Sequence, residues 1–484
     1  MNSRKTIFLA IPFLIAGCST LPNLSTPPTK DIVAADSFRG ASELGNKYNE
    51  TWWNSFNDPL LSNLIAIATK SNLDFRMAVL KVQEARAGST ANDSRLLPSV
   101  NIESTVSDSR TGLPKPYKIG APDIRATRAN VNMAWEIDLF GAARESANAA
   151  KFEAKAAAYG VDAVRLMVAS EVARNYFIWQ DARIRLGLLK KFLETQSETE
   201  RVVSNLEKNG QASAFDLSRA SAETRKVSAQ IPALETLISI SENRIAVLLT
   251  ESPIKALPLL QNSTKPELIE APSMPTGQPV ELLERRPDLK VAEMKFLAEQ
   301  SKLKEKHANQ LPKFYLSALL GREGLTINST PLSPVMYSNV ALAFTMPIFN
   351  AGRLQAEVDA QSAVEKSAAL TYQKSVLTAV EDVENALVAL SEKRHELSEQ
   401  LEAKNQLQKS LYHANSLYRE GQIGLLQLLD VQRSLIAEDL SIAESRSQTL
   451  LNSVQLYKAM GGGWITEKSL AESGGAKTKN TEVN

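Results

Sequence analysis

The chain has 484 residues, and its 55 basic and 54 acidic side chains leave a formal net charge of +1 at pH 7. Such a balance gives no electrostatic reason to expect nucleic acid as a partner. The single cysteine excludes an internal disulfide framework. Aromatic residues make up only 6% of the chain, a composition more typical of long packed helices than of a broad globular core.

The N-terminus has the layout of an export signal. Arg4 and Lys5 precede the apolar run 6–16, which is too short to span a bilayer. The sequence LIAGC then ends at Cys18 and resembles a bacterial lipobox. We expect residues 1–17 to be a signal peptide and Cys18 to carry a lipid; the alternative is a chance cysteine after an ordinary signal.

The residues after the cysteine predict a tether and a destination. Ser19, in place of aspartate, favours passage to the outer membrane by resemblance to bacterial lipoproteins. The segment 18–51 is rich in proline, serine and threonine, so we expect an extended, lipid-anchored stretch. Beyond it, no segment has eighteen uninterrupted apolar residues, which argues against a helical inner-membrane span.

Two helices of moderate length are predicted at corresponding places. One runs from Pro59 towards Arg95 with Asp58 as its N-cap, and the other covers 288–310. Each ends at a Leu-Pro pair, where the residue before proline avoids helical geometry. These pairs are Leu97-Pro98 and Leu311-Pro312.

After each pair the apolar residues change to a period of two, which is typical of strands with one apolar face. We predict strands at about 99–109, 127–138, 313–321 and 338–347, with long proline-containing loops at about 110–127 and 322–338. Strands of this length cross a bilayer when tilted, but four cannot close a barrel. Because open strand edges are not tolerated in lipid, we expect several copies to pool their strands, and three copies would supply twelve.

Two long runs predict rod-like helices. The run 354–420 contains no glycine or proline and would be about 100 Å long as a helix. Its apolar residues repeat every 3.5 positions, the pattern of a helix that supercoils against a neighbour. They are Val376, Val380, Val383, Leu387 and Leu390, with Ala379, Ala386 and Ala389 as a second seam. The run 145–208 is its counterpart.

The same motifs flank both runs and indicate a tandem duplication. LFGAAR (139–144) precedes the first run, and IFNAGR (348–353) precedes the second. We expect Gly141 and Gly352 to turn the chain from strand into helix. NGQASAFDL and EGQIGLLQL end the runs, with Gly210 and Gly421 as helix stops.

The fold class that follows is mainly α with strand pairs, in two repeats of helix, β-hairpin, long helix and return helix. The expected boundaries are 52–252 for the first repeat, 253–279 for a proline-rich linker, 280–465 for the second repeat and 466–484 for a polar, disordered tail.

Residues for chemistry are sparse. His307, His395 and His413 are the only histidines, and each lies in a predicted helix. We therefore predict no metal site. The sequence contains no phosphate-binding glycine loop with its lysine, so we also expect no cofactor and no enzymatic activity.

Taken with the lipobox and the duplication, the motifs resemble those of the outer membrane factor family, the TolC-like ducts of tripartite efflux pumps. The branch they resemble is the lipoprotein branch paired with resistance-nodulation-division (RND) transporters. The resemblance implies a homotrimer in the outer-membrane lipid bilayer, with a twelve-stranded β-barrel, a long periplasmic extension and a twelve-helix periplasmic α-barrel. It implies an inner-membrane RND transporter and a periplasmic adaptor (membrane fusion protein) as partners. It also implies passive conduction of drugs or other small solutes.

By the same resemblance, a periplasmic gate should lie just past the glycine stops. Asp430 matches an acidic gate position, whereas Gln427 and Ile423 depart from the charged or polar residues of relatives. Asp216 and Tyr418 match residues that hydrogen-bond neighbouring helices in closed ducts. The alternatives are a solvated charge at a helix tip for the two aspartates and a place in the heptad seam for Tyr418.

The resemblance also implies that the adaptor docks at the tips around Gly210 and Gly421, although a purely structural role is an equal alternative for these glycines. Three other functions stay open: a duct for metal-ion export, a duct for protein secretion, and a lipid-anchored coiled-coil scaffold. The alternating strands in both halves argue against the scaffold.

Overall fold

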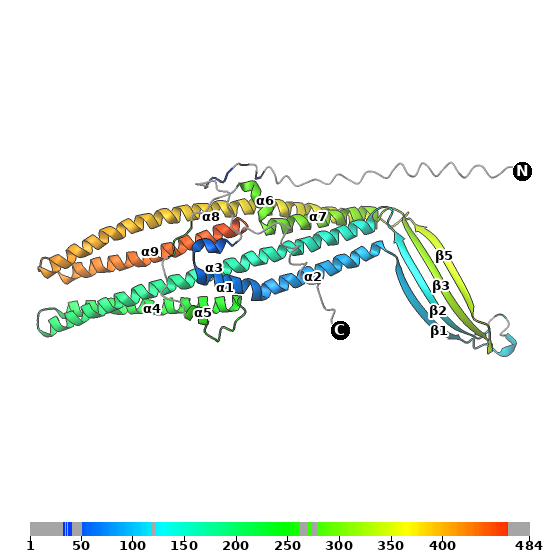
Figure 1. Ribbon diagram of the computed structural model, residues 1–484, viewed down its shortest axis with the longest axis horizontal. Helices are drawn as coiled ribbons and strands as arrows, with labels where there is room; N and C mark the ends of the chain where they lie inside the picture. The colour runs from blue at the N-terminus through cyan, green and yellow to red at the C-terminus, as the bar shows by residue number, and fades with distance from the viewer. Residues whose placement is uncertain are drawn as a thin grey trace, which may run out of the picture. The chain divides into compact units, whose positions relative to one another are not determined.

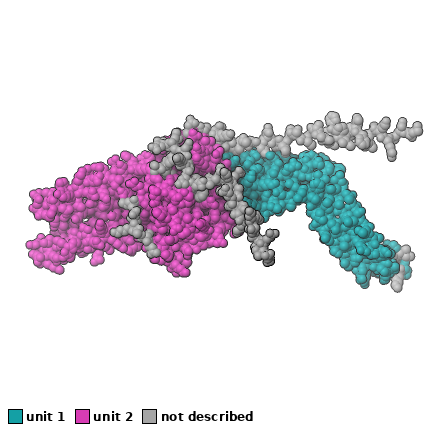
Figure 2. Space-filling model, in the orientation of Figure 1, with its two compact units in different colours: residues 1–27, 81–158, 291–373 teal, residues 28–80, 159–290, 374–484 magenta. Residues whose placement is uncertain are grey.

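The computed structural model (Figure 1) describes residues 32–33, 35, 37–40, 51–117, 120, 122–261, 269–272 and 278–462. The expected signal peptide, Cys18 and the tail 466–484 lie outside these residues. The described chain forms two compact units (Figure 2). Residues 81–158 and 291–373 form the unit that we call the sheet unit, and the remaining described residues form the hairpin unit.

Four helices dominate the chain and have matching lengths in the two halves. α3 (Ala142–Lys208) and α8 (Arg353–Arg419) each have 67 residues, and each contributes residues to both units. α4 (Ala214–Leu248) and α9 (Leu425–Ala459) each have 35 residues. The first seam predicted along α8 is buried at Val376 and Val383, and the second at Ala379. The two halves are thus structural repeats, as the duplicated motifs predicted.

One predicted helix is interrupted. Instead of a single helix after Pro59, the chain forms α1 (Pro59–Ser71) and α2 (Leu73–Asp93), with Asn72 between them in an extended conformation at ψ 133°. The Asn72 side chain donates to the carbonyl of Leu248 at 3.0 Å, and this distant contact stabilises the break. α7 (Pro287–Ala308), the counterpart in the second half, is continuous. Asp58 caps α1, as expected, by accepting from the backbone N–H groups of Leu60 and Leu61.

Short helical segments complete the described helices. They are η2 (Trp52–Phe56), η3 (Ser94–Leu96), η4 (Lys115–Tyr117), α5 (Pro258–Gln261), η5 (Pro279–Glu281) and α6 (Leu282–Arg285). No helix in the described part of the chain carries an apolar run long enough to cross a bilayer.

The strands of the sheet unit form one antiparallel sheet. They are β1 (Ser99–Ser109), β2 (Ile124–Ile137), β3 (Lys313–Ile327), β4 (Thr330–Pro331) and β5 (Val335–Thr345). The long strands follow the order β1-β2-β3-β5, and β4 pairs only with the end of β3. The two hairpins are therefore joined through β2 and β3. The expected loop at 322–338 is shorter than predicted, because β3 continues to Ile327 and β4 follows it.

The core of the hairpin unit is aromatic at its centre. Trp52 stacks on Tyr457 of α9 with ring centroids 5.1 Å apart, and Phe56 lies 5.1 Å from Phe177 of α3. Residues of α1 and the C-terminal end of α4 complete this core. The first repeat and the last helix of the second repeat are therefore packed on one another within this unit.

Candidate functional site: the two helical tips

Both long helices end in the same backbone motif within the hairpin unit. Gly210 has φ 69° and Gly421 has φ 71°, and each adopts the left-handed conformation that favours glycine. After α3, the N–H groups of Gly210 and Gln211 donate to the carbonyls of Glu207 and Leu206 at 2.9 and 2.8 Å. The corresponding donors after α8 make the same two bonds, so both ends are Schellman motifs. A Cβ at either glycine would meet open space, so backbone conformation alone selects glycine here.

The return helix of the first repeat begins with a capping box. The Ser213 hydroxyl accepts from the backbone N–H of Asp216 at 3.1 Å. The Asp216 carboxylate accepts in return from the Ser213 hydroxyl at 2.6 Å and from its N–H at 3.2 Å. These bonds hold the pKa of Asp216 below its ordinary value. Asp216 is thus engaged in its own helix start; a contact with a neighbouring helix of another copy stays a prediction.

The return helix of the second repeat begins without such a cap. Gly424 is its N-cap residue, and no side chain there accepts a hydrogen bond. Gln427 occupies the place that Asp216 has in the first repeat, and its backbone N–H donates to the carbonyl of Gly424 at 3.2 Å. The two tips therefore share their helix stop and differ in their helix start.

Asp430 lies one turn further along α9 and is exposed. Its carboxylate pairs with Arg433 of the same helix, and Arg433 also reaches Glu223 of α4 at 3.5 Å. A narrow cleft between α3, α4 and α9 brings these groups together. It is lined by Phe192, Gln196, Arg219, Glu223, Leu426, Leu429, Asp430 and Arg433. The candidate gate carboxylate is thus linked to the first repeat through one arginine.

Tyr418 is half-buried in the last turn of α8, where its carbonyl accepts from Gly421 at 3.1 Å. No hydrogen bond involves its hydroxyl among the described residues. A role between helices of different copies stays a prediction for this residue.

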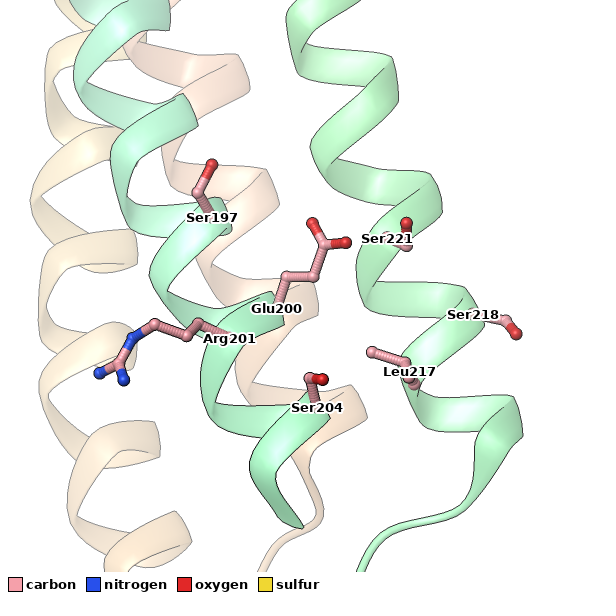
Figure 3. A pocket seen from close by; sticks show the side chains of 7 residues that line it. All are labelled: Ser197, Glu200, Arg201, Ser204, Leu217, Ser218 and Ser221. Atoms are coloured by element: carbon pink, nitrogen blue, oxygen red, sulfur yellow. The ribbon is translucent and has the colours of Figure 1, made fainter. Parts of the chain in front are cut away.

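An open groove of about 760 Å³ runs between α3 and α4 above the first tip (Figure 3). Glu200 and Leu217 point into the gap between the helices, whereas Arg201 points away from α4 and pairs with Glu198 at 2.5 Å. The remaining lining residues are serines at 197, 204, 218 and 221. The groove therefore presents small polar side chains and one carboxylate.

The strand-to-helix turns in the sheet unit agree with the expected glycine geometry. Gly141 and Gly352 have φ of 85° and 83°, in the left-handed region. Asp138 caps α3 by accepting from the N–H groups of Ala143 and Arg144 at 3.2 and 2.8 Å. The positive φ of these glycines lets the chain turn from strand into helix, and the long helices α3 and α8 begin directly after them.

The sequence profile of the family described as "Outer membrane efflux protein" matches residues 64–251 and 279–462. The chain belongs to the outer membrane efflux protein family. The two matched segments follow the two repeats. This protein is an outer-membrane channel of an efflux system, and, like its family, it is not an enzyme.

Curated relatives extend over nearly the full chain. The pyoverdine export outer membrane protein OpmQ of Pseudomonas aeruginosa is 28% identical over 97% of this chain and 98% of its own length. The probable outer membrane lipoprotein SilC of Salmonella typhimurium is 28% identical, with coverage of 96% and 100%. The cation efflux system protein CusC of Escherichia coli is 26% identical over 96% and 100%.

Solved structures share the fold. The outer membrane channel CmeC of Campylobacter jejuni superposes with a TM-score of 0.82 at 22% identity, covering 93% of this chain and 96% of its own. The open state of MtrE of Neisseria gonorrhoeae gives a TM-score of 0.79 at 24% identity, with 92% and 98% covered. The predicted fold class, mainly helical with β-hairpins in two repeats, is confirmed.

The ion pairs that connect Asp430 through Arg433 to Glu223 in this efflux channel were not predicted from the sequence. Arg433 lies three residues after Asp430, a spacing at which side chains of one helix meet, so this pair could have been found. Glu223 belongs to the other repeat, and no sequence signal places it beside Arg433. The buried Arg286, which precedes α7, was missed as well.

Proposed function

We propose that three copies of this channel assemble into a homotrimeric exit duct, with a twelve-stranded barrel in the outer membrane and a twelve-helix tunnel in the periplasm. The observation that carries the proposal is the sheet of four long strands, in which β1 and β5 each pair on one side only among the described residues. Unpaired edges are not tolerated in lipid, and known transmembrane barrels have at least eight strands. Three copies supply twelve strands and pair every edge.

Size measurement in detergent tests this assembly. A heat-sensitive species of about three times 53.0 kDa is expected before boiling, and the single chain after it. A monomer that persists in mild detergent would contradict the duct and favour the lipid-anchored scaffold.

We further propose a lipid anchor on Cys18 after removal of residues 1–17, followed by the extended segment 18–51. The backbone N–H groups of Arg39 and Gly40 donate to the carboxylate of Glu384 on α8 at 2.8 and 3.3 Å, so these two residues of the segment contact a side chain of this helix rather than solvent alone. The name of SilC, an outer membrane lipoprotein at 28% identity, supports the anchor. Mass spectrometry of the membrane-extracted protein tests it, and a Cys18→Ala variant should lose the lipid mass.

The proposed partners are a periplasmic adaptor, which would dock at the tips around Gly210 and Gly421, and an inner-membrane RND transporter. The serine-rich groove beside the first tip supports this docking, because it leaves a polar surface between two helices open to a helical partner (Figure 3). The proposed domain extents are 52–252 and 280–465 for the repeats, 253–279 for the linker and 466–484 for the tail.

Gating is proposed at the second tip, by a ring of Asp430 carboxylates from three copies, with Gln427 one turn before it. Like charges around an axis attract cations and respond to changes in helix tilt. Single-channel recording of Asp430→Ala is expected to show raised conductance or reduced cation preference. Arg433→Gln is the matched variant: it keeps the carboxylate, removes its partner and should increase cation preference. Unchanged conductance and selectivity in Asp430→Ala would remove Asp430 from the gate.

The proposed cargo is drugs or other small solutes. Relatives of similar identity are named for pyoverdine, toluene and cations, so similarity to them does not single out one cargo. The name of CusC, a cation efflux system protein, favours metal-ion export as the second candidate, and protein secretion is the third. A susceptibility panel on a strain without the gene separates them: sensitivity to many unrelated organic compounds supports drug efflux, and sensitivity confined to copper or silver supports metal export. If the strain shows neither kind of sensitivity, the proteins that it secretes should be compared with those of the parent strain.

A further inference from the structure

The two faces of the sheet differ sharply in polarity. In an antiparallel sheet, directly opposed residues lie on the same face. One face is apolar along all four long strands, as its opposed pairs show: Val100 and Met133, Val131 and Leu320, Leu316 and Leu342, and Phe314 and Phe344. The other face carries the pairs Asn101 and Asn132, Glu103 and Asn130, and Arg128 and Glu323.

The apolar face is also highly exposed. Val106 is 73% exposed, Val340 74% and Phe344 69%. An outward apolar band and a polar interior are the pattern of transmembrane barrels. If the proposed trimeric barrel forms, and the present inference rests on it, the apolar face contacts lipid and the polar face lines the lumen.

Arginines occupy the apolar face at the end of the strands far from the helices. Arg322 lies opposite Ala129 on one side and Met336 on the other, and it is exposed. Met336 is 71% exposed, and among the large apolar residues of β5 on this face it lies nearest the N-terminal end of the strand. Within the described residues, Arg322 makes no ion pair.

A second pair of cations lies further along the same face. Arg125 lies opposite Asp108, and its guanidinium is 3.3 Å from that carboxylate. Arg110 reaches the same carboxylate at 3.0 Å, and Asp123 adds a second negative charge near Arg110, so two guanidiniums and two carboxylates form one network. Arg125 is also opposite Thr326, four residues beyond Arg322 on β3, which places it about 13 Å further along the strand direction.

The cations of the opposite face are balanced, in contrast. Arg128 pairs with Glu323 at 2.5 Å, and Lys313 pairs with Glu136 at 3.2 Å. The unbalanced cation, Arg322, therefore lies on the lipid-contacting face at the edge of the apolar band, and the Arg125–Arg110 pair lies just beyond it. This depth corresponds to the headgroup zone of the bilayer, where an arginine on the outside of a barrel is tolerated far better than at the midplane.

We propose that Arg322 and the Arg125–Arg110 pair bind the phosphate groups of lipid headgroups in the leaflet that surrounds the helix-distal ends of the strands. A guanidinium binds phosphate through two parallel hydrogen bonds, and it is more weakly hydrated than an ammonium group, so it suits this interface. Arg322 supplies a full unpaired charge, and the outer pair supplies two further guanidinium donors beside Asp108 and Asp123. The two tiers fit an amphiphile with more than one phosphate.

The experiment measures lipid binding to the purified full-length channel by native mass spectrometry and by titration in detergent, with diphosphorylated lipid A as the probe. Arg322→Gln should weaken binding about tenfold, and the double variant with Arg125→Gln should weaken it further. Arg322→Lys should restore part of the affinity, and raised salt should weaken wild-type binding. Arg128→Gln, on the polar face of the same sheet, is the matched control and should bind like wild type.

Monophosphorylated lipid A and phosphatidylcholine identify the headgroup chemistry that is bound. Affinity that falls from diphosphorylated to monophosphorylated lipid A, and falls again for phosphatidylcholine, whose single phosphate carries its own choline cation, supports the proposal. Equal binding of all three lipids, unchanged binding by the double variant, or an equal loss in Arg128→Gln would overturn it. The oligomeric mass and the single-channel conductance are measured on the same preparations. A wild-type protein that binds the lipid but neither forms trimers nor conducts would overturn the proposed duct without overturning the lipid site.

Discussion

The two repeats of this efflux channel share helix lengths and turns but attach their first helices to the bundle with opposite chemistry. In the first repeat, the residue before the helix-starting proline is Asp58, which caps α1 and accepts from the Tyr176 hydroxyl of α3 at 2.5 Å. In the second repeat, the same place holds Arg286, a buried donor. At this position the first repeat has an anionic acceptor, Asp58, bound by a neutral hydroxyl. The second repeat has a cationic donor, Arg286, bound by carboxylates and carbonyls.

Arg286 connects three helices of the second repeat. It donates to Asp288 at the start of α7, to Asp382 of α8 at 3.1 Å and to the carbonyl of Ala459 at the end of α9 at 2.9 Å. The last bond places a cation at a helix C-terminus, where the helix dipole favours it. Duplication has therefore kept the backbone plan while the polar contacts that hold each copy have diverged, and variants in matched places can measure that divergence.

The largest effect is expected for Arg286→Gln. The carboxylates of Asp288 and Asp382 are 52% and 37% exposed, so they regain water when the arginine is removed. The buried carbonyls of Ala379 and Ala459 lose a charged donor, and each such loss costs about 1–3 kcal/mol. The free energy of unfolding, measured by urea denaturation in detergent, should fall by about 2–5 kcal/mol. Arg285→Gln is the control: Arg285 pairs with Glu281 at 2.9 Å in a more exposed position, and such pairs contribute about 0–1 kcal/mol. Equal effects of the two variants would contradict the special role of Arg286.

The matching variant in the first repeat is Tyr176→Phe. It leaves a buried oxygen of Asp58 without its donor, a loss that costs about 1–3 kcal/mol. Burial and the bond to Asp58 raise the pKa of the Tyr176 hydroxyl, so the hydroxyl stays protonated and the effect should be the same at neutral and mildly alkaline pH. Tyr412→Phe, on a side chain 71% exposed, should change nothing. If Tyr176→Phe lowered the free energy of unfolding more than Arg286→Gln does, the contact of the first repeat would be the stronger one, contrary to expectation.

The tips allow a second matched comparison, with a smaller effect. Ser213→Ala removes the side-chain cap of α4 and should cost about 1 kcal/mol, whereas Ser213→Gly, which copies the second repeat, should cost only a few tenths. Amide hydrogen exchange in the first turn of α4 measures this directly. Faster exchange in α9 than in α4 of the wild type is expected, and equal rates would show that the missing cap has no consequence.

The cap also carries a pH dependence. The hydrogen bonds from Ser213 lower the pKa of Asp216 from its ordinary value of 3.8, so the ionised carboxylate stabilises the tip above that value. This contribution is lost as the pH falls through the lowered pKa. Exchange at the first tip should therefore accelerate below about pH 4 in the wild type and stay flat in Asp216→Asn.

Much of this plan was visible in the sequence because it depends on local periodicity. The 3.5-residue repeat around Val376 and Val383 predicted the rods, the alternation after each Leu-Pro pair predicted the strands, and Asp58 with Pro59 predicted a helix start. The glycines at 210 and 421 predicted both helix stops. Each of these signals acts within a few residues, so a single sequence carries it.

The features that escaped prediction depend on residues far apart in the chain. The break at Asn72 is stabilised by a carbonyl of Leu248, and the link from Asp430 through Arg433 ends on Glu223 of the other repeat. The joining of the two hairpins through β2 and β3 is likewise a pairing between repeats. No period of hydrophobicity encodes such contacts, because many partners would satisfy the same pattern.

The smallest expected effect tests whether the missing cap at the second tip matters for opening. Gly424 has φ −83°, which any residue adopts, but a Cβ there would meet the Gln427 amide oxygen at 3.1 Å. The double variant Gly424→Ser with Gln427→Asp relieves that contact, because aspartate is shorter, and installs the box of the first repeat. It should stabilise the start of α9 by a few tenths of a kcal/mol, slow its amide exchange and lower the single-channel open probability. Gly424→Ala with Gln427→Asp is the control, since it adds a Cβ without a hydroxyl. If both double variants slow exchange equally, added bulk rather than the cap is responsible, and if exchange slows while open probability is unchanged, the start of α9 is not the part that moves on opening.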